Sequence, residues 1–221
     1  MKPARTHLYI GALTALLCAP DAFVGPARAD EDPHAHHRPR AAVVDRLGGA
    51  VGIAIPDAEL VTQNGAAVRL ATDVVGDKIV VMDFVYTTCT TVCPVLSAIF
   101  SQVQTSLAER LGQDVAIVSI SVDPARDTPA ALRDYSARHG AREGWTWLTG
   151  AKPVVDKVLQ QLGAYTPNFE DHPSMVLVGD GRTGQWVRFL GFPGAEQIMD
   201  KIDEFSAARA DGHPSGRVRG E

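Results

Sequence analysis

The chain has 221 residues, of which 45% are hydrophobic and 6% aromatic, and its formal net charge is −5 at pH 7. This length and composition supply one well-filled globular domain with flexible ends. The balance is acidic and no long basic run falls on a predicted face, which argues against a nucleic-acid-binding protein. No nucleic acid is therefore expected among its partners.

Residues 1–29 have the pattern of an export signal. Lys2 and Arg5 precede the short apolar run Leu8–Ala19, and Ala27-Arg28-Ala29 fits a small-residue cleavage site. We expect cleavage after Ala29. The alternative is an uncleaved anchor, although the apolar run is too short to span a bilayer comfortably. The protein is therefore predicted to act outside the cytoplasm, in the periplasm or facing it from a membrane.

The segments on either side of the expected domain have the composition of unstructured chain. Residues 30–50 are polar, contain His34, His36 and His37, and show neither helical nor strand periodicity, which predicts a flexible arm. Weak capture of Cu(II) or Zn(II) by these histidines is the alternative to a simple solvated arm. Residues 209–221 are rich in Gly, Pro and charge and predict a disordered tail.

Hydrophobic patterning predicts alternating strands and helices through a single domain, residues 51–208. Leu60–Thr62 and Ala67–Leu70 flank an Asn-Gly step, which is typical of a hairpin. Lys78–Tyr86 is a continuous apolar run, as in a strand buried on both faces. The further predicted elements are a helix from Pro94 to a stop at Gly112, a strand at Val115–Val122, a helix opened by the cap signature Asp127-Thr128-Pro129 and ended by Gly140, a strand at Trp145–Leu148, a helix at Val154–Leu162, strands at Ser174–Gly179 and Trp186–Leu190, and a helix at Ala195–Ala208.

The order of these elements predicts the fold. A βαβ crossover, a second helix, and a closing hairpin with a terminal helix are what a thioredoxin-like sandwich requires. We therefore expect an α/β fold, a thioredoxin-like sandwich with a central mixed sheet and an N-terminal β-hairpin. Trp145 and Trp147 alternate along one strand, so they share a face and are predicted to lie in the core.

Two cysteines lie where the strand 78–86 passes into the next helix. Cys89 and Cys93 are four residues apart, so the first helical turn would bring both thiols onto one face. The helix N-terminus favours negative charge and lowers the pKa of thiols there, which suits metal binding and disulfide exchange equally. Signal cleavage would remove Cys18, and in an oxidising compartment the remaining pair would form a disulfide unless a reductase or a metal intervened. A purely stabilising disulfide is a weaker interpretation, because so short a loop saves little chain entropy.

His172 is the candidate third residue of this site. It immediately precedes the strand predicted at Ser174–Gly179. In a thioredoxin-like sheet, the loop that enters this strand faces the loop that carries the cysteines. Two thiolates alone suit a thiol oxidoreductase, whereas an added imidazole gives a soft three-coordinate site suited to Cu(I). A surface or capping role is the alternative for a lone histidine.

Three segments of the chain resemble the signature segments of the Sco/SenC family, in the same order and with similar separations. They are FVYTTCTTVCP, ISVDPARDTPAALRDY and EDHPSMVLVGDG, and the resemblance covers roughly Ile55 to Phe205. By position it implies that Cys89, Cys93 and His172 are copper ligands. It also implies that Asp123-Pro124 is the Asp-Pro pair that follows the second strand in this family.

The resemblance implies a copper-binding metallochaperone with a copper ion as its ligand. Such a protein would deliver copper to the CuA site of cytochrome c oxidase, or reduce the cysteines of that site so that copper can enter. The implied partner is the oxidase subunit that carries the CuA site, with a thiol reductase or another copper chaperone as a further partner. A chaperone of this kind is not expected to be an enzyme in the strict sense.

Two departures from the family pattern keep a second function open. Thr90-Thr91 stands where family members commonly have Pro-Asp, and Pro173 stands where small or β-branched residues are common. Pro173 is close to the cis-proline position of thioredoxins, so an exported thiol-disulfide oxidoreductase with Cys89 and Cys93 as its catalytic redox pair is the alternative. The usual thioredoxin spacing is CxxC, which argues mildly against it. A peroxiredoxin ranks last, because the chain lacks the expected upstream proline and a separated resolving cysteine.

Overall fold

The computed structural model describes residues 49–212, in which eight strands form one mixed sheet. Across the sheet the strands lie in the order β1-β8-β7-β4-β5-β6-β2-β3. Strands β4, β5 and β6 run parallel, and the other neighbours pair antiparallel. The strands are β1 (Gly49–Val51), β2 (Glu59–Thr62), β3 (Ala67–Arg69), β4 (Ile79–Val85), β5 (Val115–Ser121), β6 (Trp145–Thr149), β7 (Met175–Asp180) and β8 (Gln185–Leu190). The predicted signal, the histidine cluster and residues 213–221 lie outside the described residues.

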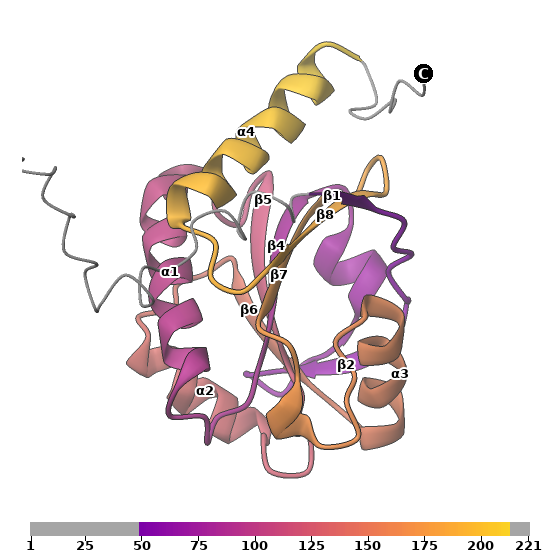
Figure 1. Cartoon of the computed structure of the whole chain (residues 1–221), viewed down its shortest axis with the longest axis vertical. Helices are drawn as coiled ribbons and strands as arrows, with labels where there is room; N and C mark the ends of the chain where they lie inside the picture. Colours follow the sequence, from indigo (N-terminus) through magenta and orange to yellow (C-terminus); the bar gives the residue numbers. More distant parts are fainter. Residues whose placement is uncertain (1–48, 213–221) are drawn as a thin grey trace, which may run out of the picture. The chain divides into compact units, whose positions relative to one another are not determined.

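Helices cover both faces of the sheet (Figure 1). Helices α1 (Val92–Leu107), α2 (Pro129–Arg138) and α4 (Ala195–Ala210) pack on one face, and α3 (Lys152–Leu162) packs on the other together with the π-helical turn at Leu70–Val75. Short 3-10 turns occupy Ala108–Arg110 and Phe169–Asp171. Within residues 49–212, no helix combines the length and the apolar character needed to cross a membrane.

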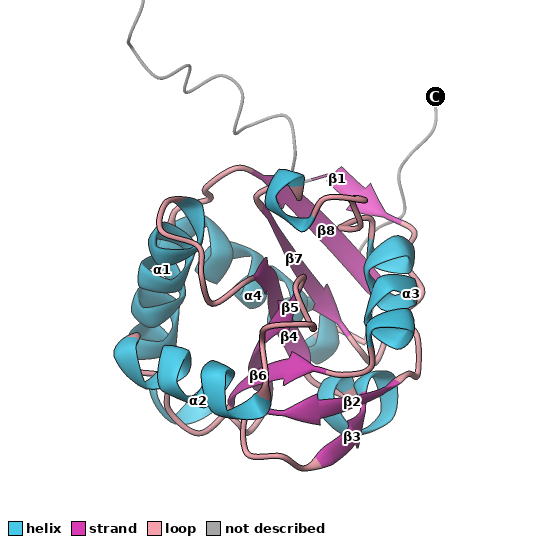
Figure 2. Ribbon diagram, turned by 90° about the horizontal axis from the view of Figure 1, so that it is seen from below, coloured by secondary structure: helices cyan, strands magenta, loops and turns pink. Residues whose placement is uncertain are grey.

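The predicted fold class is confirmed. The chain forms an α/β thioredoxin-like sandwich around a central mixed sheet, and β2 and β3 make the predicted N-terminal hairpin. The hairpin extends the sheet beyond β6, where Val61 pairs with Thr149 (Figure 2). The turn at Asn64-Gly65 uses the positive φ of 81° that glycine adopts without strain.

Strand β4 lies at the centre of the sheet, because it pairs with both β5 and β7. Every residue of β4 and of β5 is buried, as expected for strands with helices on both faces. Val81 and Val85 point into the core under α1, whereas Val80 and Met82 point into the core under α3. Trp145 and Trp147 of β6 lie in the α1 core, as predicted from their alternation.

The helix that follows the cysteines differs from the prediction at both ends. It begins at Val92, so Cys93 lies inside its first turn, and its α-helical part ends at Leu107 rather than at Gly112. The chain turns at Ala108, where φ is 48°, into the 3-10 turn, and Gly112 serves the later turn into β5. The helical spacing continues through this turn, which is why the sequence pattern did not reveal the break.

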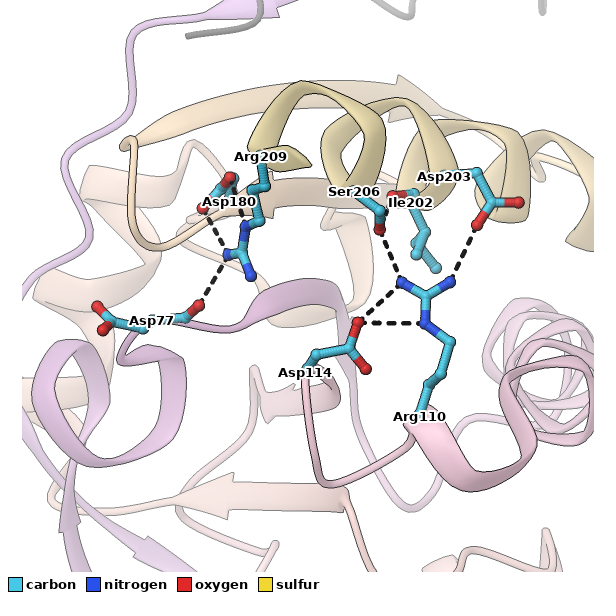
Figure 3. A network of polar contacts seen from close by, with 8 residues as sticks. All are labelled: Asp77, Arg110, Asp114, Asp180, Ile202, Asp203, Ser206 and Arg209. Atoms are coloured by element: carbon cyan, nitrogen blue, oxygen red, sulfur yellow. Dashed lines mark hydrogen bonds and ion pairs between the residues drawn. The ribbon is translucent and has the colours of Figure 1, made fainter. Parts of the chain in front are cut away.

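Two predicted domain boundaries need correction. Residues 49 and 50 belong to β1, which pairs with β8, although they were assigned to the flexible arm. Helix α4 continues to Ala210, so Arg209 is not part of a disordered tail. Its guanidinium binds Asp180 at the end of β7, and this ion pair holds the last turn of the helix against the sheet (Figure 3).

Candidate metal and thiol site

The two cysteines lie together at the end of β4. Cys89 closes a turn in which its N–H donates to the carbonyl of Tyr86 at 3.1 Å, and Cys93 follows in the first turn of α1. The backbone N–H of Cys93 donates to the sulfur of Cys89, with 3.3 Å between nitrogen and sulfur. Both are free thiols and both are buried. The structure therefore confirms the predicted placement of the two thiols at a strand-to-helix junction.

The environment makes the two thiols chemically unequal. Burial alone would raise the pKa of Cys89, but hydrogen bonds from Cys93, from the Thr91 backbone and from the Tyr86 hydroxyl lower it to about 7. Burial raises the pKa of Cys93 well above its usual range, and its hydrogen bond to Cys89 adds to that shift. Cys89 is therefore the thiol that ionises near neutral pH, while Cys93 keeps its proton.

His172 follows the 3-10 turn Phe169–Asp171 and leads into β7, and its side chain is 7% exposed. Its Nδ1 lies 3.3 Å from the carbonyl oxygen of Pro173, which can only accept, so Nδ1 carries the proton. The other ring nitrogen, Nε2, is buried and has no hydrogen-bond partner in the protein. Burial also lowers the pKa of His172, so the imidazole is neutral. A neutral imidazole with a free Nε2 lone pair is the form that binds a metal.

Tyr86 links the cysteine loop to the histidine loop. Its ring meets the His172 ring edge-on, with 5.8 Å between centroids, and it meets the Phe169 ring in the same way at 5.1 Å. Its hydroxyl forms a hydrogen bond with Cys89, and burial together with that bond raises the pKa of Tyr86 to about 12. Sequence reasoning missed this residue, because an aromatic residue at the end of a buried strand has the appearance of ordinary core.

The three predicted ligands thus share one end of the sheet, but only the cysteines touch. Among residues 49–212, no group of three or more His, Cys, Asp or Glu side chains is arranged to hold a metal ion. The His172 ring contacts the Tyr86 ring, and the three-ligand set stays a prediction. Residues 49–212 contain no cis peptide bond, so Pro173 does not have the cis-proline geometry of thioredoxins.

A buried carboxylate lies in the core behind the cysteine pair. Asp83 of β4 is fully buried, and neither carboxylate oxygen has a partner within hydrogen-bond geometry. Burial raises the pKa of Asp83 to about 7, partly offset by the nearby Ser119 hydroxyl. Its charge also raises the pKa of Cys93 and of Tyr135. Sequence reasoning also missed Asp83. The signal that could have revealed it is an aspartate inside an apolar strand, six residues before Cys89, but the run was interpreted by its overall hydrophobic pattern.

The loop between β5 and α2 borders the same site. Asp123 pairs with Arg126 at 2.8 Å, and the Arg126 guanidinium lies over the Phe169 ring, 5.3 Å from its centroid. The predicted cap signature is right for Thr128, which accepts the Ala131 N–H, and Pro129 is the first helical residue. Asp127 takes no part in the cap. Its carboxylate points toward the cysteine loop instead.

The fold and the paired thiols define a thioredoxin-like protein with a dithiol site at the end of its central strand. Residues 54–206 match the family model described as SCO1/SenC, which is well over half of the chain. The chain belongs to the SCO1/SenC family, as the three signature segments predicted.

Similar proteins agree with this assignment. An SCO1 protein homolog of Bacillus subtilis is 40% identical over 70 residues, which make up 31% of this chain and 35% of that protein. The matched segments span about a third to a half of the curated relatives. Among solved structures, BsSco, described as a member of the Sco family of cytochrome c oxidase assembly proteins, superposes with a TM-score of 0.61 at 23% identity, over 73% of this chain and 98% of that one. Copper-bound ScoI of Bradyrhizobium japonicum gives 0.56 at 26% identity, over 72% and 99%.

Proposed function

We propose that this protein is an exported copper chaperone that binds copper through Cys89, Cys93 and His172 and delivers it to the CuA site of cytochrome c oxidase. The observation that carries this proposal is the buried, neutral imidazole of His172 with its unpartnered Nε2, one aromatic ring away from a thiolate. Membership in the SCO1/SenC family supports it, as does the copper held by a solved relative. The export pattern in residues 1–29 is consistent with an extracytoplasmic site of action.

The donor set fits cuprous copper. Thiolates and imidazole are the soft ligands that Cu(I) prefers, and a three-coordinate site leaves room for an incoming ligand of an acceptor. Cys89 already supplies a thiolate at neutral pH, whereas Cys93 must release its proton when copper binds. Copper at the Cys89 sulfur would compete with the hydrogen bond that the Tyr86 hydroxyl makes to that sulfur. Copper uptake is therefore coupled to a local change at Tyr86.

A second function is favoured by the unequal thiols. A thiolate at Cys89 beside a protonated Cys93 is the arrangement of a thiol reductase, with a nucleophile and a buried partner. In such a reaction the Cys89 thiolate attacks an acceptor disulfide and releases one acceptor thiolate, which takes up a proton. Cys93 then loses its proton and attacks the mixed disulfide, which forms the Cys89–Cys93 disulfide and frees the second acceptor thiol. An external thiol reductase would return the pair to the dithiol.

The test is an anaerobic Cu(I) titration of the reduced protein against a chromophoric Cu(I) chelator. His172→Ala should weaken copper binding by at least about tenfold, because it removes one of three ligands. His139→Ala is the control, since His139 is a half-buried histidine whose ring lies against Tyr135 at the end of α2.

Two results would count against the chaperone. Binding that is equal in wild type and His172→Ala would show that the ligand assignment is wrong. Weak copper binding together with rapid reduction of a model disulfide would favour the reductase. If copper binds as expected, incubation of the loaded protein with a CuA-domain acceptor should move copper to the acceptor, and copper that stays in place would contradict delivery.

A further inference from the structure

We propose that Asp127 is a positioning residue for the Cys89 thiol, acting through Thr87. This inference deepens the proposed function, because it concerns the same thiol, but its main test uses no metal. The carboxylate comes from the loop between β5 and α2, which is far from the cysteines in sequence. In the folded protein it reaches the loop that carries them.

Asp127 ties the two loops together with three hydrogen bonds. Its Oδ1 accepts the Thr87 backbone N–H at 3.1 Å and the Thr87 hydroxyl at 2.6 Å. Its Oδ2 accepts the Ser121 hydroxyl at 2.6 Å. The side chain is 1% exposed, so these bonds form away from competing water. Charge-assisted hydrogen bonds of this length are about twice as strong as neutral ones.

The chemistry of these partners explains why the residue is an aspartate. All three groups that face the carboxylate act as donors: one backbone N–H and two hydroxyls. An ionised carboxylate offers only acceptors and satisfies all of them at once. An asparagine would present an NH2 group to at least one donor. Because burying a carboxylate is costly unless it is fully hydrogen-bonded, this group is placed where its bonds determine a local structure.

The structure that these bonds determine is the approach to Cys89. Thr87 lies two residues before the thiol, and the following turn brings Cys89 under the Cys93 N–H, whose bond to the sulfur stabilises the reduced form. A loop that is free to move at Thr87 would hold this bond less well. Asp127 therefore acts on the sulfur through the backbone and does not touch it.

The loop of Asp127 also reaches the histidine side of the site. Arg126, the preceding residue, lies over Phe169, and Phe169 contacts the Tyr86 ring, which also contacts His172. Asp123 fixes Arg126 through their ion pair, and the carbonyl of Asp123 accepts the Asp127 N–H at 2.9 Å. One short segment thus contacts both the cysteine loop and the histidine loop. A carboxylate that holds this segment in place sets the geometry of the whole site.

The experiment measures the Cys89–Cys93 reduction potential of the metal-free protein in thiol–disulfide redox buffers. Thr87→Val removes only the hydroxyl that binds Asp127, and Asp127→Asn removes the negative charge and replaces one acceptor oxygen with an NH2 group. Both should destabilise the dithiol and shift its equilibrium with the disulfide by about three- to tenfold, which makes the potential about 15–30 mV more negative. At fixed pH, the rate of Cys89 alkylation should fall in the same two variants. Thr87→Ser keeps the hydroxyl and should behave as wild type.

Thr128→Val is the matched control. It removes the N-cap of α2 one residue from Asp127, which lowers the stability of the fold without touching Thr87. Thr128→Val should leave the reduction potential and the alkylation rate of Cys89 unchanged. The proposal is overturned if Thr87→Val and Asp127→Asn also lower only the stability and leave both of these quantities unchanged. If wild type fails to bind Cu(I) while these shifts appear, the copper function fails and the positioning role stands.

Discussion

The two ends of the central sheet differ in how many of their buried polar groups have hydrogen-bond partners. Where β4 begins and β7 ends, the ion pairs Arg209–Asp180 and Arg110–Asp203 connect α4 to the neighbouring chain (Figure 3). Arg209 donates to Asp180 at 2.6 and 2.8 Å and to the carbonyl of Asp77 at 2.7 Å. Arg110 joins the start of β5 to α4 by contacts with Asp114, Asp203 and Ser206.

At the other end, polar atoms are buried without protein partners. These are Nε2 of His172 and both oxygens of Asp83, followed deeper in the same core by the hydroxyls of Ser97 and Tyr135 and the indole nitrogen of Trp147. Each such group costs about 1–3 kcal/mol when it is left unsatisfied. The α4 end is therefore built for stability, while the cysteine end keeps donors and acceptors available for a ligand or a proton.

The largest expected effect comes from breaking the pairing at the α4 end. Arg209→Met keeps much of the side-chain volume but leaves the Asp180 carboxylate buried and alone, since the two side chains are 13% and 1% exposed. We expect a loss of about 3 kcal/mol in the free energy of unfolding, measured by urea denaturation at neutral pH. Arg110→Met is the control at the more exposed network, where a loss of about 1 kcal/mol or less is expected.

The effect of Arg209→Met should also depend on pH. Arg209 holds the pKa of Asp180 below its ordinary value against the opposing effect of burial. The stability contributed by this carboxylate is thus present above its unfolded pKa and is lost as the pH falls through its folded pKa. The difference between wild type and Arg209→Met should shrink in acid. A difference that stays constant would mean that packing, and not the ion pair, is responsible.

A smaller effect of opposite sign is expected at the cysteine end. Asp83 has a folded pKa of about 7, above its ordinary value of 3.8, because it is buried. Between these two values the unfolded chain has lost the proton and the folded chain keeps it, so stability falls as the pH rises through this window. Asp83→Asn removes this penalty and should stabilise the protein by about 2 kcal/mol at about pH 8, with little change at about pH 4.

Thermal unfolding at the two pH values measures this effect. Thr149→Val is the control, because Thr149 of β6 also buries a polar atom without a partner but does not titrate. Its effect on stability should be nearly the same at both pH values. A stabilisation by Asp83→Asn that is equal at both pH values would show that Asp83 is not a buried acid of raised pKa.

The fold was predictable from sequence because its signals are local and agree with one another. The apolar run of β4, the Asn-Gly turn and the helical spacing after Cys93 each determine one element, and their order leaves few topologies. The proximity of the two cysteines was also predictable from their four-residue spacing, although Cys89 lies in the turn before α1 and only Cys93 lies in the first helical turn. The ends of α1 and α4 were not, because Ala108 carries no sign of its positive φ and Arg209 is held by a partner 29 residues away.

The less predictable part of the site lies in contacts between distant loops. Asp127 matched a helix cap in sequence, and only the fold reveals that it binds Thr87, 40 residues earlier. Tyr86 has the sequence pattern of a core residue, but its hydroxyl forms a hydrogen bond with Cys89 and its ring contacts His172. Both residues have side chains with two plausible local roles, and a pattern of residue types does not select between them. Motif resemblance proposed the ligands, but it does not reveal which residues position them.

The smallest expected effect tests the hydroxyl that lies between the two loops. Tyr86→Phe keeps the ring contacts with His172 and Phe169 but removes the hydrogen bond to Cys89. Because a donor stabilises the thiolate, its loss should raise the Cys89 pKa from about 7 by roughly half a unit or less. The pH dependence of the iodoacetamide reaction measures this shift.

Tyr135→Phe is the control for this substitution. Tyr135 is also a buried tyrosine, and it stacks on Trp147 in the core behind the thiols. Its loss of a hydroxyl should leave the alkylation profile of Cys89 nearly unchanged. If Tyr86→Phe also binds Cu(I) more tightly than wild type, the hydroxyl competes with copper for the Cys89 sulfur. If both tyrosine variants shift the alkylation profile equally, the general polarity of the core determines the pKa of the Cys89 thiol. The contrast between the two ends of the sheet then does not depend on Tyr86.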